Sequence, residues 1–453
     1  MNPRQWYGWL LDRWDVLRAS YWFFPVQMAL LSGALAIGMV EADRRVDPTY
    51  VEAVPWLGQV SAAGARSVLS TIAGSMMTVT SVVFSITIVA LTLTSSQFGP
   101  RLLRTFLRDR ASQVALGTFV ATFFYTLLVL RAVESPERVP VMATAGGVAL
   151  AIVSLFVLIF YVHHAVSSIQ ASSVIASVVA EIEEHLPRLF PETIGEGPDP
   201  EKRAQARRRI EEIEEKGLAV RAEAQGYVRL LDDETLMELA REHDLLVHVL
   251  TRPGAFVSPG RVLLRVGPAE RADDEVQQCL RATCVLGDHR TPVQDLCFLT
   301  DQLAEMAARA LSPGVNDPKI ATECVHRLGA VIAEVAGREM PSGHRYDDDV
   351  LRVVVEPTRF EEIVASALDP VRRHGAHDAQ VATAVLEGLA GAVEACTDQE
   401  RRRILDEHAR EVRDAFLAAG RTDSKRDLAA VEAAFGRVQE ALAEEDPGGT
   451  RPA

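Results

Sequence analysis

Four long apolar segments without a charged side chain dominate the first 165 residues. They cover about 21–40, 68–95, 112–130 and 139–162. Each is long enough to cross about 30 Å of hydrocarbon as an α-helix, which takes about 20 residues. A helix also satisfies its own backbone polar groups, as hydrocarbon requires. The sequence therefore predicts a four-span transmembrane helical domain over residues 1–165.

The residues before the first span favour a helix at the membrane surface. Trp6, Trp9 and Trp14 recur at helical spacing within 3–18, with charged residues between them. Aromatic side chains of this kind gather at the boundary between membrane and water, where an amphipathic helix lies along the surface. We therefore expect an interfacial helix over 3–18. The run that follows is too long for the apolar part of a signal peptide, so we expect it to be a retained span.

The charge of the chain divides at the end of these spans. Residues 1–165 carry 12 Arg and 9 Asp or Glu, whereas residues 166–453 carry 35 Lys or Arg and 53 Asp or Glu, so the net charges are +3 and −18. Seven Arg flank the spans on the side of the N-terminus and five on the other side. This bias places both termini in the cytoplasm. The total charge of −15 disfavours a nucleic-acid partner, which needs a concentrated basic surface.

The second span carries one narrow line of small and hydroxylated residues. Steps of three and four residues follow one face of a helix. Apart from Ile88, the residues along this face are Ser67, Thr71, Gly74, Thr78, Ser81, Ser85, Thr92 and Ser95. Such a line either lets helices pack closely, or lines a water-filled path in an oligomer, where hydroxyls replace part of the hydration of an ion. Both interpretations remain open from the sequence.

The four spans contain no Asp, Glu, Lys or Arg. Proton-coupled transporters and voltage sensors carry ionisable groups within the membrane, so active transport is disfavoured. We therefore expect an oligomer that forms or regulates a passive conduit for ions or small solutes. The alternative is a non-conducting sensor or scaffold whose cytoplasmic domain binds a partner.

A basic segment follows the second span. Its members are Arg101, Arg104, Arg108 and Arg110. Arginines beside a span anchor it to anionic lipid head groups. The same residues would also give a pore an electropositive vestibule, and the two interpretations are compatible.

Two stretches of the sequence resemble a known family. The first reads Ser-Ser-Gln-Phe-Gly-Pro-Arg-Leu-Leu-Arg-Thr-Phe-Leu-Arg-Asp-Arg over 95–110 and continues into Gln113–Phe119. The second is Ala-Leu-Ser-Pro-Gly-Val-Asn-Asp-Pro over 310–318. Both resemble a family of bacterial predicted membrane proteins, the domain-of-unknown-function-2254 family, over nearly the whole chain. The resemblance implies a multi-pass protein of the inner membrane with a cytosolic C-terminal part, and it brings no established activity.

The remainder of the chain is predicted to be a cytoplasmic α+β domain, so the fold class is mainly α. Apolar residues continue at helical spacing beyond the fourth span, which predicts an amphipathic extension of that helix. Short runs of β-forming residues between turn signals then predict a small β-rich module before a helical bundle. The expected segments are the extension (166–192), a charged linker and helix (193–216), the β-rich module (217–270), a mainly helical domain (271–445) that contains one strand (350–355), and a disordered tail (446–453).

A corner motif stands out within the helical domain. It consists of Ser312, Pro313, Gly314, Asn316, Asp317 and Pro318. Asp317 is suited to cap a helix that begins at Pro318. The alternative is a ligand or subunit contact through Asn316 and Asp317, with Arg309 one helical turn earlier.

The sequence offers little support for catalysis. It contains no P-loop, no dinucleotide-binding glycine pattern, no HExxH and no nucleophile elbow. His374, His377 and Asp378 are interpreted as a surface turn rather than a metal site. The five cysteines lack paired spacing and are expected to be reduced thiols. We therefore expect no catalytic residues, cofactor or metal, and we expect the lipid bilayer and further copies of the chain as partners.

Overall fold

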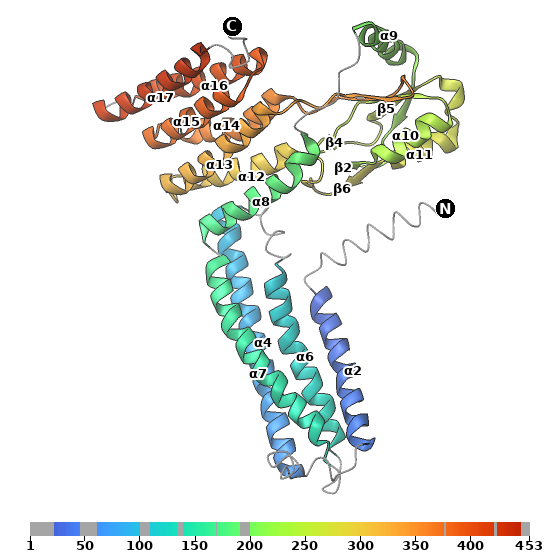
Figure 1. Cartoon of the computed structure of the whole chain (residues 1–453), viewed down its shortest axis with the longest axis vertical. Coiled ribbons are helices and arrows are strands. Elements are labelled where there is room, and N and C mark those ends of the chain that lie inside the picture. Colours follow the sequence, from blue (N-terminus) through green and yellow to red (C-terminus); the bar gives the residue numbers. More distant parts are fainter. Residues whose placement is uncertain are drawn as a thin grey trace, which may run out of the picture. The chain divides into compact units, whose positions relative to one another are not determined.

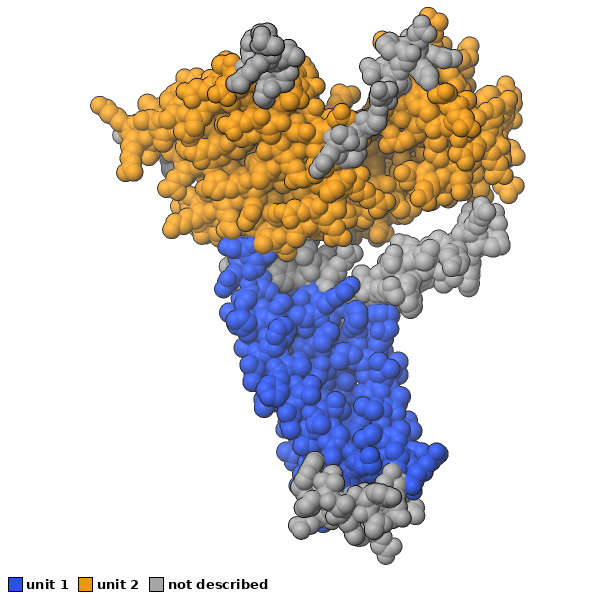
Figure 2. All heavy atoms as spheres, in the orientation of Figure 1, with its two compact units in different colours: residues 1–174 blue, residues 175–453 orange. Residues whose placement is uncertain are grey.

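The structure, a computed structural model, describes most of the chain. The described residues are 22–45, 61–99, 109–133, 139–168, 170–190, 200–375, 377–420 and 424–444. Two compact units are present, residues 1–174 (unit 1) and residues 175–453 (unit 2), blue and orange in Figure 2. The surface helix expected over 3–18 and the tail expected over 446–453 lie outside the described residues.

Unit 1 contains the four long apolar helices that the sequence predicts. They are α2 (Phe23–Arg45), α4 (Ala62–Phe98), α6 (Arg110–Ala132) and α7 (Val141–Ser168), shown in Figure 1. All four are long and apolar enough to span a membrane. In α6, 61% of the apolar window is buried, against 17% or less in the other three helices. The α6 helix is therefore the centre on which the others pack.

Hydroxyl groups join the helices inside unit 1. The hydroxyls of Thr87 in α4 and Tyr161 in α7 lie 2.6 Å apart. Those of Thr122 in α6 and Ser154 in α7 lie 2.9 Å apart. Tyr125 donates its hydroxyl to a backbone carbonyl of α7 at 3.0 Å. A polar group without a partner is costly in hydrocarbon, so these pairs fix how the helices face one another.

Charged side chains satisfy helix ends at one edge of unit 1. The Asp43 carboxylate of α2 accepts the backbone N–H groups of Met142 and Ala143 at 3.0 and 2.8 Å. The Arg66 guanidinium of α4 donates to the carbonyl of Val133 at 3.0 Å. Helix ends carry unpaired N–H and C=O groups and partial charges of opposite sign. These side chains therefore cap the start of α7 and the end of α6 from neighbouring helices.

The α8 helix (Ala171–Leu189) leads into unit 2 and is separate from α7. The fourth span was expected to continue as one helix into its extension over 166–192. In the structure α7 ends at Ser168 and Gln170 lies in a bend, so the extension is a second helix. Ser168, the last residue of α7, donates its hydroxyl to the carbonyl of Ala165 at 3.1 Å. The buried apolar residues of α8 are Val174, Ile175, Val178, Ile182 and Leu186.

Two β-sheets form the first part of unit 2. The larger has the strand order β1-β5-β3-β8-β7, and the smaller has the order β4-β2-β6. Strands β3 and β8 pair in parallel, and the other pairs are antiparallel. The strands are β1 (Leu218–Arg221), β2 (Gly226–Leu231), β3 (Leu246–Val249), β4 (Phe256–Val257), β5 (Val262–Gly267), β6 (Cys284–Gly287), β7 (His344–Asp347) and β8 (Val350–Val355).

Three of these strands lie outside the range 217–270 in which the β-rich module was expected. The predicted strand at 350–355 is present as β8, and it joins the large sheet instead of interrupting a helical bundle. The β6 and β7 strands have four residues each and were not predicted. Pairing between segments far apart in sequence leaves no local pattern, so sequence periodicity does not reveal it.

Helices cover both faces of the large sheet. On one face α10 (Asp233–Glu242), α11 (Asp274–Ala282) and the small sheet enclose an apolar core. On the other face lies α9 (Pro200–Lys216). Because strand side chains alternate between faces, Leu246 and His248 of β3 face α9. The buried apolar residues on this second face are Ala206, Ile213, Leu246, Leu351 and Val354.

A helical bundle completes the described part of unit 2. Its helices are α12 (Leu296–Ala310), α13 (Pro318–Gly337), α14 (Phe360–Gly375), α15 (Ala379–Ala395), α16 (Gln399–Ala418) and α17 (Lys425–Ala443). The α13 and α15 backbones approach closely where Gly329 meets Gly388. A Cβ atom on Gly329 would lie 2.8 Å from the Cα atom of Gly388. The fold class predicted from the sequence, mainly α with an α+β part after the spans, is confirmed.

Replacing Gly329 by Ala tests this helix crossing. The added methyl group meets the backbone of α15, so the helices must separate, and overpacking of this kind costs about 1–3 kcal/mol. We expect a lower midpoint of thermal unfolding for the purified chain. The control Gly391→Ala adds the same group to α15 where nothing lies within 4 Å. Its midpoint should stay or rise, because Ala favours a helix more than Gly does. Equal midpoints for the two variants would contradict the close approach.

Candidate functional site: an outward-facing hydroxyl line

The hydroxyl line of α4 points away from the rest of unit 1. The residues through which α4 packs are Ala65, Leu69, Ala73, Met76, Val83 and Ala90. The line follows the opposite side, roughly half a turn away around a helix of 3.6 residues per turn. Its exposed members are Ser67, Thr71, Gly74, Thr78, Ser81, Ser85 and Thr92, and Ser95 is half-buried. Within the described residues, the line therefore does not pack the four helices of one chain together.

The hydroxyls of this line bond to their own helix. Thr78 donates to the carbonyl of Gly74 at 3.1 Å, and Thr92 donates to that of Ile88 at 2.9 Å. Thr71, Ser81 and Ser85 donate in the same way to the carbonyl four residues earlier. A hydroxyl that donates its proton inward keeps its oxygen lone pairs for an outside donor or a cation. The outer surface of α4 is thus a row of hydrogen-bond acceptors.

Apolar side chains border the row. Met77 and Val82 are 56% and 51% exposed on either side of it. Outward positions on α2 and α7 carry large apolar groups such as Leu30 and Phe156, which are 70% and 66% exposed. Ile88 is 50% exposed and is the one large apolar side chain in the row. The candidate site is therefore a narrow polar row between exposed apolar side chains, interrupted once by Ile88.

The basic segment is described only at its end. The members outside the described residues are Arg101, Arg104 and Arg108. Arg110 is exposed and begins α6, which Asp109 caps. Asp109 also lies 2.9 Å from the Nε2 atom of His164 in α7. Burial acts to raise the pKa of the Asp109 carboxyl, but hydrogen bonds from Ser112 and His164 outweigh it and lower the pKa. This end of unit 1 is thus held by an ionised carboxylate.

The corner motif joins α12 to α13. As predicted, Asp317 caps a helix that begins at Pro318, and its carboxylate accepts two backbone N–H groups at 3.1 and 3.2 Å. Asn316 has a φ of +50°, a left-handed conformation that Asn adopts more readily than most residues. Arg309 donates to Glu305 at 3.0 Å. The preceding loop contains Ser312, Pro313 and Gly314. The side chains of Asp317 and Arg309 are thus engaged in local structure.

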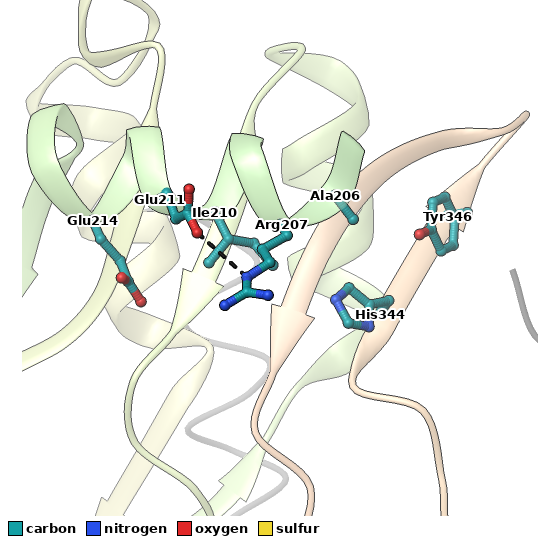
Figure 3. A pocket seen from close by; sticks show the side chains of 7 residues that line it. All are labelled: Ala206, Arg207, Ile210, Glu211, Glu214, His344 and Tyr346. Carbon is teal, nitrogen blue, oxygen red and sulfur yellow. Dashed lines mark ion pairs between the residues drawn. The ribbon is translucent and has the colours of Figure 1, made fainter. Parts of the chain in front are cut away.

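A cavity of about 490 Å³ lies beneath α9 in unit 2 (Figure 3). Its lining residues are Ala206, Arg207, Ile210, Glu211 and Glu214 of α9, and His344 and Tyr346 of β7. Arg207 pairs with Glu211 at 3.4 Å, and the buried hydroxyl of Tyr346 has no hydrogen-bond partner. Sequence analysis missed this cavity, because only the pairing of β7 and β8 with β3 brings its two walls together.

His248 is a buried titratable residue on this face of the sheet. Its side chain is 6% exposed, and its Nδ1 atom lies 3.6 Å from the Glu214 carboxylate without a hydrogen bond. Burial lowers the pKa of this imidazole below its usual value of 6.5. The charges of Arg265 and His344 act in the same direction. Glu214 and Glu356 act to raise the pKa, but do not outweigh burial.

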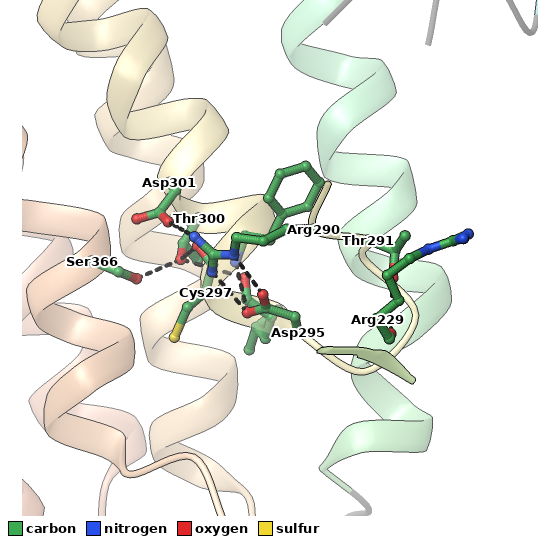
Figure 4. A network of polar contacts seen from close by, with 10 residues as sticks. Arg229, Arg290, Thr291, Asp295, Cys297, Thr300, Asp301 and Ser366 are labelled. Atoms are coloured by element: carbon green, nitrogen blue, oxygen red, sulfur yellow. Dashed lines mark hydrogen bonds and ion pairs between the residues drawn. The ribbon is translucent and has the colours of Figure 1, made fainter. Parts of the chain in front are cut away.

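A network around Arg290 joins the β part of unit 2 to its helices (Figure 4). Arg290 donates to Asp295 from Nε at 2.8 Å and from Nη2 at 3.0 Å, and to Asp301 from Nη1 at 2.7 Å. Burial acts to lower the pKa of this guanidinium, but the two carboxylates outweigh it and raise the pKa. Thr291 donates to the carbonyl of Arg229 in β2 at 3.0 Å. Every one of these contacts is internal, so we interpret the network as a structural junction.

The cysteines of unit 2 are free thiols. Cys284, Cys324 and Cys396 are buried, and Cys279 and Cys297 are half-buried. Burial raises the pKa of the Cys324 thiol to about 12. A thiol in such surroundings stays protonated and is a poor nucleophile.

His248 makes the stability of unit 2 depend on pH. The pKa of His248 is lower in the folded chain than in the unfolded chain, so the unfolded chain takes up the proton first as pH falls. The contribution of neutral His248 to folding stability is therefore complete above about pH 6.5. It is lost as pH falls below that value toward the pKa of the folded chain. We expect the temperature of half-unfolding to be lower at about pH 5 than at about pH 7. The substitution His248→Gln should make this difference smaller. The remaining pH dependence comes from half-buried His344 and His408, whose pKa values burial also lowers. The control His374→Gln alters an exposed ring and should leave the dependence unchanged. An identical profile for wild type and H248Q would contradict this assignment.

Comparison of the chain with known proteins identifies its family. Residues 18–391 match the family model described as predicted membrane protein, DUF2254. Uncharacterized proteins of Mycobacterium bovis and Mycobacterium tuberculosis are each 31% identical to this chain over 409 residues, which cover 86% of this chain and 74% of the relative. No solved structure matches the chain. Because the matched range includes all four apolar helices and most of unit 2, the chain belongs to the DUF2254 family of predicted membrane proteins.

Proposed function

We propose that several copies of this protein surround a passive conduit for ions or small solutes, with the hydroxyl line of α4 as its wall. The observation that supports this is the direction of the line, which faces outward, opposite the side through which α4 packs in its own chain. A single helix provides only one wall. A closed path therefore requires further copies around a symmetry axis, as in other homo-oligomers.

Lipid hydrocarbon offers no hydrogen-bond partner to the hydroxyls of this line. Each hydroxyl oxygen has two lone pairs, and in hydrocarbon neither finds an outside donor. Elsewhere on unit 1, outward positions carry side chains such as Leu31 and Ile159, which fit hydrocarbon. Water, ions or polar groups of another copy would satisfy the line instead. Of these, an ion exchanges part of its hydration shell for hydroxyl oxygens without needing a buried charge.

The charges of the described spans support passive permeation. Those of α2 and α6 are confined to the helix ends, at Glu41, Asp43, Arg44, Arg45, Arg110 and Arg131. Coupled transporters and pumps use ionisable groups within the membrane. We therefore infer movement down a gradient, without catalysis and without a cofactor.

The location we propose is the bacterial inner membrane, with both termini in the cytoplasm. The bias of seven Arg to five across the spans supports this orientation. Residues 166–453, with a net charge of −18, then lie on the cytoplasmic side. The partners we infer are the lipid bilayer and other copies of the chain, and the acidic charge disfavours nucleic acid.

Conductance of the purified chain in a planar lipid bilayer tests the conduit. We expect the wild type to conduct and the double variant Thr78→Leu, Ser81→Leu to conduct about tenfold less, because two hydroxyl contacts of roughly 0.5–1.5 kcal/mol each are lost. The matched control is Met77→Leu with Val82→Leu, which changes exposed apolar positions beside the line. It should conduct like the wild type.

A non-conducting scaffold predicts a different result. In that case the wild type does not conduct, and T78L with S81L changes only the oligomeric state measured by native mass spectrometry. That pair of outcomes would make the line a packing surface between copies and would end the conduit proposal.

Ile88 provides a second test, because it interrupts the hydroxyl line. A ring of isoleucines in an oligomer would form an apolar constriction, and such constrictions hinder the passage of water and ions. We expect Ile88→Thr to raise conductance severalfold. Leu93→Thr is the control, since Leu93 is similarly exposed but lies about a quarter of a turn from the line. Equal effects of the two substitutions would contradict a constriction at Ile88.

A further inference from the structure

We propose that unit 2 binds a divalent transition-metal ion of the zinc class between α14 and α16, through Asp369, His408 and Glu411. The potential ligand atoms of these three residues all lie within 4.8 Å of one another. The site is in the helical bundle, and it is independent of the hydroxyl line and of the proposed conduit.

The two helices hold the ligands in place. His408 and Glu411 are three residues apart on α16, so their side chains leave the same face of that helix. Asp369 comes from α14, which packs on α16. A metal ion here would therefore link two helices whose backbones are already in position.

The chemistry of the three ligands fits zinc. Zn²⁺ takes imidazole nitrogen and carboxylate oxygen ligands, and sites with three protein ligands leave a fourth position for water. Mg²⁺ and Ca²⁺ prefer oxygen ligands alone, so His408 disfavours them. The Glu411 side chain is 52% exposed, whereas Asp369 and His408 are half-buried. An ion can thus reach the site from solvent on the Glu411 side.

Arg372 is a cation that lies near both of these carboxylates, and its contacts with them are long. Its Nη2 atom lies 3.3 Å from Asp369 and 3.4 Å from Glu411, and its buried Nε atom has no hydrogen-bond partner. Charge-assisted bonds of this type are normally about 2.7–2.9 Å long. The guanidinium of Arg290 in the same unit reaches its carboxylates at 2.7 and 2.8 Å. The two carboxylates therefore hold Arg372 loosely, and a divalent ion would displace it.

A second arginine orients one of the ligands. Arg373 donates to the Oδ2 atom of Asp369 at 3.1 Å, whereas Arg372 is near the Oδ1 atom. When Arg372 moves away, Oδ1 becomes free for the ion while Oδ2 keeps its partner. Such outer contacts direct a ligand toward the metal in many metal sites.

Titration of the purified full-length chain with Zn²⁺, followed by calorimetry, tests the site. We expect one ion per chain and a rise in the midpoint of thermal unfolding, since an ion that binds only the folded state stabilises it. The variants Asp369→Asn and His408→Gln should each bind Zn²⁺ at least about tenfold more weakly, the size of effect seen when a metal site loses a supporting group. Arg372→Gln should bind it more tightly, because the competing cation is gone.

The control is His374→Gln, which changes an exposed histidine of α14 outside the cluster and should leave Zn²⁺ binding unchanged. Unfolding curves without metal show whether each variant is folded. No saturable binding by the wild type would overturn the proposal. Binding by H408Q as tight as that of the wild type, or weaker binding by R372Q, would overturn it as well.

Discussion

The requirement that every polar group find a partner in hydrocarbon governs the structure of unit 1. Hydroxyl pairs such as Thr122 with Ser154 point inward around α6, and Asp43 and Arg66 close helix ends from neighbouring helices. The α4 line is different, because its hydroxyls bond only to their own helix and face outward. Among the described residues of unit 1, the hydroxyl line is thus a polar surface that the four helices do not cover. The conduit proposal follows from this asymmetry.

Unit 2 depends on contacts between segments that are distant in the sequence. The parallel pairing of β3 with β8 brings the residues around 350 into a sheet that begins at Leu218. The Arg290 network then connects the β part to α12. The strand pairing forms the cavity under α9, and the packing of α14 on α16 brings together Asp369, His408 and Glu411.

Sequence reasoning succeeded where a property is local. Span length and freedom from charge predicted the four apolar helices, and the Asp-Pro pair at 317–318 predicted a capped helix start. It failed at the bend near Gln170, because apolar spacing continues through the break between α7 and α8. It also missed β6 and β7, since strands of four residues show almost no periodicity and depend on their partners.

The sequence alone determined that α4 carries a line of small and hydroxylated residues, because helical geometry fixes the angles between side chains along one helix. It did not determine whether that line faces the bundle or the exterior. The rotation of a helix about its axis is decided by packing against its neighbours, here through Leu69, Met76 and Val83. Likewise, the sequence placed His408 and Glu411 on one helical face, but only the packing of α14 against α16 brought Asp369 to them.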